Sequence, residues 1–241
     1  MGAPGSSLGG ARPKANVLDE QGNPWIAKFL SKNDAYDIGA WELLLYQLAS
    51  TAGVVMAESK LLNISGNYHT FLTKRFDRIR DDRIHFASAM TITGNNEDTV
   101  SDHIASYLDL AEFIRFSGSN SQTDLHQLWR RIVFNIAVSN TDDHLRNHGF
   151  LLSRGGWRLA PAYDMNPTID KDGLSLNIDM DNNALDFQLA WSVGEYFMLA
   201  DQEMQNIFKE VSKAVQGWRA VARNIGISRQ EQETMATAFR W

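Results

Sequence analysis

The pattern of apolar residues changes near residue 100, and this change constrains the fold more than any other feature. Up to about residue 80, short apolar stretches such as WIAKF are separated by turn residues, which is typical of strands. From residue 101, long stretches such as SQTDLHQLWRRIVFNIAVSN carry apolar residues at helical spacing. We therefore predict an α+β protein in which a sheet-rich part (residues 1–80) precedes a larger, mainly helical part (residues 81–241).

Turn residues and periodicity locate the elements. Strands are predicted in the stretches KANVLD, PWIAKFL, VVMAESKLLNI and YHTFLTKRFDR, and a helix in DIGAWELLLYQLASTAG, which stops near Gly53. The later stretches SDHIASYLDLAEFIRF and SQTDLHQLWRRIVFNIAVSN have polar starts suited to helix capping. FLLSRGGWRLAP predicts a hairpin that turns at Gly155 and Gly156, and residues 192–241 are predicted to be largely helical.

Composition limits the classes of function. The 241 residues have a formal net charge of −6, which disfavours direct binding of nucleic acid through the overall field. The sequence has no cysteine, so disulfides and thiolate metal sites are excluded. No apolar run approaches the roughly 20 residues that span a bilayer, and the start of the sequence lacks a signal-peptide pattern. We expect a soluble, cytoplasmic protein without membrane contact.

The stretch NTDDHLRNHGF carries the strongest signal for chemistry. Protein kinases place an aspartate and an asparagine, with four residues between them, on the loop after a long helix. Asp142 and Asn147 have this spacing. The predicted hairpin follows, and then Asp164 in YDM, where kinases have a second metal-binding aspartate. This order predicts Asp142 as the acceptor of a substrate proton and Asn147 and Asp164 as metal ligands.

The sheet-rich part offers the complementary groups. Lys28 lies mid-strand in WIAKF, where a lysine can reach nucleotide phosphates, and Glu42 on the next helix can pair with it. The stretch GSSLGGARPKA near the start of the sequence is predicted to form a glycine-rich loop. Its backbone amides can approach an anionic ligand.

Five of these stretches together resemble one family. SSLGGARPKA, WIAKF, RFDR, NTDDHLRNHG and APAYDM are similar, in sequence and order, to HipA-type serine kinases, the toxins of bacterial toxin–antitoxin systems. The resemblance implies a two-lobed, protein-kinase-like fold that uses ATP and Mg²⁺. It implies Asp142 as the catalytic base and Asn147 and Asp164 as the metal ligands. It also implies a nucleotide site made of Ser7, Gly9, Gly10, Lys14, Lys28, Lys74, Phe76, Asp77 and His144.

The resemblance further implies regulation and partners. Ser7, or Ser6 in a shifted register, matches the loop serine that such kinases autophosphorylate. A protein substrate is expected, with aminoacyl-tRNA synthetases as the known targets of the family, together with a helix-turn-helix antitoxin. Toxins of this type have a small subdomain before the glycine-rich loop, and this sequence has almost nothing there. The chain is then either a short kinase that works with a separate small protein, or a truncated or degenerate copy.

Other interpretations remain open at this point. His144 and His148 are four residues apart and would suit a zinc ion on one helical face, but LRNHG is typical of a loop. His144 is instead expected to brace the loop by hydrogen bonding. The fold could also serve as a non-catalytic module that binds nucleotide or antitoxin. The protein could also be a small-molecule phosphotransferase of the aminoglycoside-kinase type, because such enzymes use the same set of two aspartates and one asparagine.

Overall fold

The computed structural model describes residues 12–29, 31, 34–64, 68–79, 82–95 and 105–241. The strands are β1 (Lys14–Leu18), β2 (Pro24–Lys28), β3 (Ser59–Leu62), β4 (Thr70–Lys74), β5 (Arg78–Ile79), β6 (Asp82–Arg83), β7 (Phe86–Ser88), β8 (Gly149–Ser153) and β9 (Gly156–Leu159). The α-helices are α1 (Ile38–Thr51), α2 (Ala89–Thr93), α4 (Tyr107–Ser117), α5 (Ser121–Ala137), α6 (Phe187–Ser192), α7 (Asp201–Gln216), α8 (Trp218–Ile225) and α9 (Arg229–Thr234). Two 3₁₀-helices, η1 (Gly194–Phe197) and η2 (Ala236–Ala238), complete the elements near the C-terminus.

The first sheet is antiparallel and has the order β1-β2-β4-β3. β1 and β2 form a hairpin around Asp19, whose carboxylate accepts hydrogen bonds from the backbone N–H groups of Gln21 (3.0 Å) and Asn23 (2.7 Å). The register of this hairpin pairs Lys14 with Lys28. Both lysines are therefore at the same end of the sheet, on neighbouring strands.

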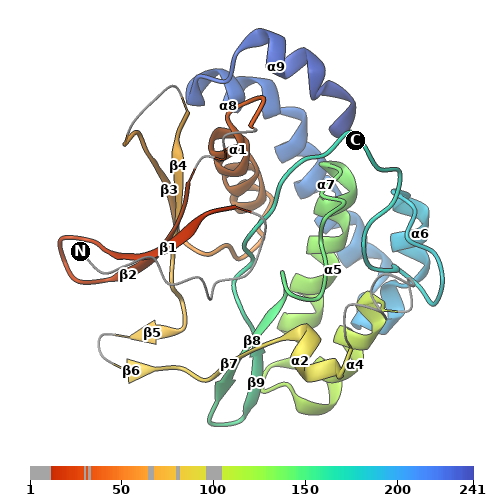
Figure 1. Ribbon diagram of the computed structural model, residues 1–241. Coiled ribbons are helices and arrows are strands. Elements are labelled where there is room, and N and C mark those ends of the chain that lie inside the picture. The colour runs from red at the N-terminus through yellow and green to blue at the C-terminus, as the bar shows by residue number, and fades with distance from the viewer. Residues whose placement is uncertain (1–11, 30, 32–33, 65–67, 80–81, 96–104) are drawn as a thin grey trace.

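Helix α1 connects this sheet to the helical part of the chain (Figure 1). It begins at Ile38 because the Asp37 carboxylate accepts a hydrogen bond from the Ala40 N–H (3.1 Å), and it ends before Gly53, which has φ +77°. Its buried face carries Trp41, whose ring lies 6.2 Å from that of Trp218 in α8. α1 thus packs on the sheet with one side and on α7 and α8 with another.

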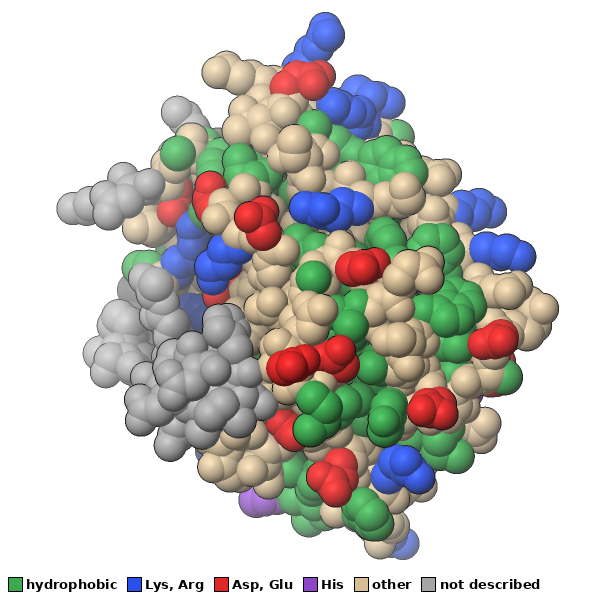
Figure 2. Space-filling model, turned by 90° about the vertical axis from the view of Figure 1, so that its right-hand side faces the viewer, with side chains coloured by type: hydrophobic (Ala, Val, Ile, Leu, Met, Phe, Trp, Pro, Cys, Tyr) green, Lys and Arg blue, Asp and Glu red, His purple; other side chains and the backbone are tan. Residues whose placement is uncertain are grey.

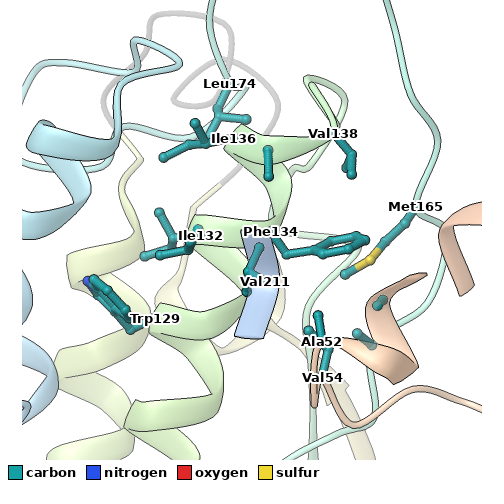
Figure 3. Close-up of a cluster of buried hydrophobic side chains, with 14 of the residues drawn as sticks. Ala52, Val54, Trp129, Ile132, Phe134, Ile136, Val138, Met165, Leu174 and Val211 are labelled. Carbon is teal, nitrogen blue, oxygen red and sulfur yellow. The ribbon is translucent and has the colours of Figure 1, made fainter. Parts of the chain in front are cut away.

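The main core surrounds α5, as Figure 3 shows. Trp129, Ile132, Phe134 and Ile136 all project from this helix into the cluster and are fully buried. Met165, which lies far along the chain, packs against the same cluster from the side of α1. The loop that leaves α5 and the loop that contains Met165 are therefore both fixed to one core.

A second, three-stranded sheet has the order β7-β8-β9 and is antiparallel throughout. The predicted hairpin in residues 150–161 is confirmed, but its turn lies at Arg154 and Gly155, one residue earlier than predicted, because Gly156 pairs with Ser153 as the first residue of β9. The polar loop 138–148 lies between the end of α5 and the start of β8. The long segment 160–186 after β9 contains no helix and runs back past this loop.

The prediction of one strand over residues 54–64 was wrong in its first half. β3 includes only Ser59–Leu62, whereas Val55 and Ala57 bond to Ala162 through their backbone groups. Residues 54–57 therefore pair with the segment after β9, a contact that an apolar run cannot predict. The first residues of the helix expected from residue 101 (101–104) lie outside the described residues; within them, Ser106 caps α4 and Tyr107 is the first residue of this helix.

The surface carries charge of both signs. On the face shown in Figure 2, acidic, basic and hydrophobic side chains are interspersed. Within the ranges described above, no helix has the length and apolar character needed to cross a bilayer. The division of the chain at residue 80 stays a prediction, because the α1 side chains share one hydrophobic cluster with α5, α7 and α8.

Candidate active site

Lys28 joins two carboxylates at the end of the first sheet. It is the last residue of β2, not a mid-strand residue, and its side chain is only 10% exposed. Its ammonium group forms ion pairs with Glu42 of α1 and with Asp164, whose Oδ1 lies 2.7 Å from Nζ. The second oxygen of Asp164 lies 3.6 Å from Lys14 Nζ. An interior strand, a buried helix face and the segment after β9 thus meet at one lysine.

The charges of this group influence one another. Burial raises the pKa of Glu42 to about 7, against the opposing effect of Lys28. Burial also works against ionisation of Asp164, but Lys28 and then Lys14 outweigh it and lower the pKa of Asp164 to about 2. For Lys28, burial acts to lower the pKa, and the two carboxylates raise it above its ordinary value. The ammonium and the Asp164 carboxylate are therefore both charged at neutral pH.

The polar loop presents Asp142 outward and keeps Asn147 inward. The Asp142 side chain is 68% exposed, and Lys171 Nζ lies 3.9 Å from its Oδ1. Asn147 is buried, and its Nδ2 donates a hydrogen bond to the Asp142 carbonyl (3.1 Å). The Asn147 N–H donates to the His144 carbonyl (2.8 Å), which closes a turn between the two functional positions. Asp142 is open to an incoming hydroxyl, and the amide oxygen of Asn147 is the atom that remains to bind a metal.

Hydrogen bonds between side chains and backbone groups hold the Asp164 segment beside this loop. Tyr163 donates its hydroxyl to the Arg146 carbonyl (2.8 Å), and the Asn166 N–H donates to Asn140 Oδ1 (3.1 Å). Between them, Asp164 has φ +60°, a left-handed conformation that is uncommon outside glycine. Such a conformation persists only where the surroundings enforce it, and here the buried side chain of Met165 and the two flanking hydrogen bonds do so.

Three of the predicted nucleotide-site residues, Lys74, Phe76 and Asp77, lie at the end of β4 and directly after it. Lys74 Nζ bonds to Glu58 (2.9 Å), and the Phe76 ring packs against Phe86 and Tyr163 at centroid distances of 5.9 and 5.7 Å. Asp77 pairs with two arginines: Arg75, through hydrogen bonds of 2.9 and 2.7 Å, and Arg78.

These pairs hold the strand end in place. The Phe76 ring also connects this region to the Asp164 segment through Tyr163.

His144 takes a different part from the one expected. Its side chain is half-buried, and its Nδ1 has no hydrogen-bond partner within the described ranges, so the backbone carbonyl and not the ring braces the loop. Among the groups that lower the pKa of Asp164, His144 ranks after Lys28 and Lys14. Ser6, Ser7, Gly9 and Gly10 lie outside the described residues.

The oxygen atoms of Asn147 and Asp164 suit a hard divalent cation whose remaining coordination positions are filled by a bound ligand. Among the described residues, no group of three or more His, Cys, Asp or Glu side chains is arranged to hold a metal alone. Asn147 and Asp164 offer oxygen atoms, which Mg²⁺ prefers, and Mg²⁺ ordinarily takes only one or two protein ligands together with phosphate oxygens. His148, by contrast, points its Nε2 at Asp143 (2.8 Å).

Sequence reasoning missed several residues of this region. Lys171 comes from the segment after Asp164, and no local pattern marks it. Tyr107, Asn135 and Asp143 form a buried group below the loop. The signal available in the sequence was Asn135, a polar residue among the apolar positions of helix 121–137.

Comparison with known proteins finds relatives whose sequences match most of this chain. Residues 6–218 match the family model described as HipA-like C-terminal domain. A proposed kinase of Sinorhizobium fredii, Y4mE, is 24% identical over 213 residues, which is 85% of this chain and 43% of the relative. A proposed kinase of Haemophilus influenzae is 24% identical over 186 residues, 66% of this chain and 52% of the relative. The chain thus spans about half the length of these curated relatives.

Two solved structures share the fold. HipA of Shewanella oneidensis MR-1, solved in complex with HipB and operator DNA, gives a TM-score of 0.75 at 18% identity and covers 99% of this chain and 63% of its own. The Helicobacter pylori proinflammatory kinase CtkA gives a TM-score of 0.56 at 11% identity and covers 88% of this chain and 94% of its own. The predicted kinase-like α+β fold is therefore confirmed. The family match includes the Lys28 strand, the Asp142 loop and the Asp164 segment, and the chain belongs to the HipA-like C-terminal domain family.

Proposed function

We propose that the protein transfers the γ-phosphoryl group of ATP to a serine or threonine hydroxyl of another protein. The observation that carries the proposal is the position of Lys28, which contacts both Glu42 and Asp164 next to the loop of Asp142 and Asn147. Kinases need a positioned lysine, metal-binding oxygens and an accessible carboxylate together. Each group alone has simpler explanations, but their convergence supports phosphoryl transfer.

In the proposed mechanism, Lys28 donates hydrogen bonds to the phosphates and is held in place by Glu42. Asn147 and Asp164 would hold Mg²⁺, which when bound would offset negative charge on the nucleotide phosphates. A carboxylate oxygen of Asp142 accepts the proton of the substrate hydroxyl while the hydroxyl oxygen attacks the γ-phosphorus. The bond between the γ-phosphorus and the bridging oxygen of the β-phosphate breaks, and ADP leaves with that oxygen. Lys14, on the neighbouring strand, adds positive charge beside Asp164. Positioning and electrostatics then supply most of the rate, without a covalent enzyme intermediate.

The finer parts of the proposal concern partners and regulation. The Shewanella HipA structure contains HipB. By analogy, we propose that the partner of this chain is a helix-turn-helix antitoxin. The protein substrate belongs to the translation apparatus, with an aminoacyl-tRNA synthetase as the first candidate. Autophosphorylation at Ser7, or at Ser6, reduces ATP affinity, because a phosphoserine adds about −1.5 to −2 charges near the nucleotide. Arg12 is already paired with Asp34 through two hydrogen bonds of 3.0 and 2.7 Å, whereas Lys14 has a longer contact of 3.6 Å with Asp164, so Lys14 is the better partner for that phosphate.

Labelled ATP tests the proposal. The purified protein is incubated with γ-labelled ATP and Mg²⁺, alone and with bacterial lysate, beside the variants Asp142→Asn and Asp172→Asn. Asp172 is an exposed aspartate of the segment after Asp164 and serves as the matched control. We expect a labelled protein band with wild type and Asp172→Asn and none with Asp142→Asn. Label on a small metabolite alone would indicate a small-molecule phosphotransferase, and ATP binding without transfer would indicate a non-catalytic module.

A further inference from the structure

A buried polar cluster lies directly below the Asp142 loop. The Asp143 side chain is 2% exposed, and its Oδ2 accepts hydrogen bonds from the Tyr107 hydroxyl (2.5 Å) and from Asn135 Nδ2 (2.8 Å). His148 Nε2 lies 2.8 Å from the same oxygen. Three side chains from three separate segments thus converge on one carboxylate oxygen.

Each partner of Asp143 is itself fixed. Tyr107 is the first residue of α4, Asn135 lies in the last turn of α5, and His148 directly precedes β8; all three are fully buried. The rings of Tyr107 and His148 also meet edge to face, 5.7 Å apart with an interplanar angle of 87°. The cluster therefore ties the loop to the two helices of the core and to the second sheet.

The same cluster continues toward Asp164. Asn135 Oδ1 accepts a hydrogen bond from Asn140 Nδ2 (3.0 Å), and Asn140 Oδ1 accepts one from the Asn166 N–H (3.1 Å). Asn166 is two residues from Asp164. One connected set of side chains thus contacts both segments that carry the candidate metal ligands.

Two successive aspartates have opposite environments. Asp142 is 68% exposed, whereas Asp143 is 2% exposed. Because neighbouring residues share a peptide unit, fixing the buried side chain of Asp143 also fixes the direction in which the side chain of Asp142 projects from the loop. Burial acts against ionisation of Asp143, but His148 and Tyr107 outweigh it and lower its pKa, so this anchor is a carboxylate that accepts strong, charge-assisted hydrogen bonds.

We infer that Asp143, held by Tyr107, Asn135 and His148, is a positioning residue that aims Asp142 at the substrate hydroxyl and keeps Asn147 at the metal. The kinetic part of this inference rests on the proposed phosphoryl transfer. The cluster touches neither nucleotide nor substrate and acts through the loop conformation.

Two variants that disturb the cluster to different degrees test the inference. Tyr107→Phe removes one hydroxyl and keeps the ring, while Asp143→Asn removes the charge and keeps the shape. Tyr196→Phe, which removes a tyrosine hydroxyl from η1, is the control. Hydrogen exchange followed by mass spectrometry reports loop opening without any need for activity. We expect amides of residues 140–147 to exchange faster in both variants, by about tenfold or more, while those of α8 and α9 and the melting temperature of Tyr107→Phe stay close to wild type.

Kinetics provide the second measurement. We expect the turnover number to fall by about ten- to a hundredfold, with the Kd for MgATP changed by less than about threefold, because misaimed catalytic groups lose rate and not ground-state binding. If Asp143→Asn fails to fold, Tyr107→Phe alone decides. Unchanged exchange of residues 140–147 in the folded variant would overturn the inference. If wild type transfers no phosphate, the proposed function fails, and faster exchange in the variants still supports the positioning of the loop.

Discussion

The ion pair between Lys28 and Asp164 predicts an unusual response to Asp164→Asn. In the absence of metal, the triphosphate and Asp164 compete for the same ammonium group, whose Nζ lies 2.7 Å from Asp164 Oδ1. Asn keeps the shape and removes the charge. We expect metal-free ATP to bind more tightly to the variant than to wild type, and MgATP to lose its advantage over metal-free ATP.

The size of the effect follows from the pKa of Asp164. A lowering of the pKa from 3.8 to about 2 corresponds to roughly 2–3 kcal/mol of net preference for the ionised form. This preference corresponds to an effect on affinity on the order of tenfold to a hundredfold, since 1.36 kcal/mol is a factor of ten. The Asp164 side chain is 30% exposed, so water screens part of the interaction. We therefore expect metal-free ATP to bind about five- to fiftyfold more tightly to Asp164→Asn.

Calorimetric titration with ATP measures this directly, once with EDTA and once with Mg²⁺. Asp172→Asn removes the same charge from an exposed position and is expected to behave as wild type in both buffers. Wild type is expected to bind ATP more tightly with Mg²⁺ than with EDTA, and Asp164→Asn with similar affinity in the two. Equal or weaker metal-free binding by Asp164→Asn would refute the idea that Asp164 competes with the phosphates for Lys28.

Three further predictions concern stability and packing. Because the pKa of Asp164 is lowered from 3.8 to about 2, its ion pairs stabilise the fold fully above about pH 4 and are lost as the pH falls through 2. Urea denaturation without metal should show a constant difference in the free energy of unfolding between wild type and Asp164→Asn from about pH 6 to about pH 5, and a difference that decreases as the pH falls from about 4 to about 2. Trp218→Ala should lower the free energy of unfolding by about 3–5 kcal/mol because the ring is fully buried, whereas Trp241→Ala, at a 55% exposed ring, should change it by less than about 0.5 kcal/mol in the same titration. Gly149→Ala should cost about 1–3 kcal/mol, since the new Cβ would lie 2.2 Å from Phe86 Cε2; an unchanged melting temperature would contradict that packing.

Local patterns predicted much of the fold. The β1–β2 hairpin, α1 and the β8–β9 hairpin all depend on contacts within about 20 residues, so periodicity and turn residues located them to within a few residues. Residues 54–57 were misassigned because their partner, Ala162, lies more than a hundred positions away. Non-local pairing leaves no mark in an apolar run.

The residues of the candidate site also divide into those that local sequence patterns predicted and those that non-local packing brings together. Asp142, Asn147 and Asp164 came from motif spacing, and Lys28 with Glu42 from their places on a strand and the next helix. The structure brings Lys28, Glu42 and Asp164 into contact. Asp143 and its partners could not be predicted, because Tyr107, Asn135 and His148 meet only after α4, α5 and β8 have packed.

The most direct test of the proposed mechanism is the single-turnover rate of phosphoryl transfer by Asp142→Asn at saturating MgATP. Asparagine has nearly the same shape but cannot accept the substrate proton, and loss of general-base help costs about a hundred- to ten-thousandfold in rate. We expect such a loss with an unchanged Kd for MgATP, while Asp172→Asn retains the wild-type rate. A wild-type rate in Asp142→Asn would contradict the assignment of Asp142 as the catalytic base.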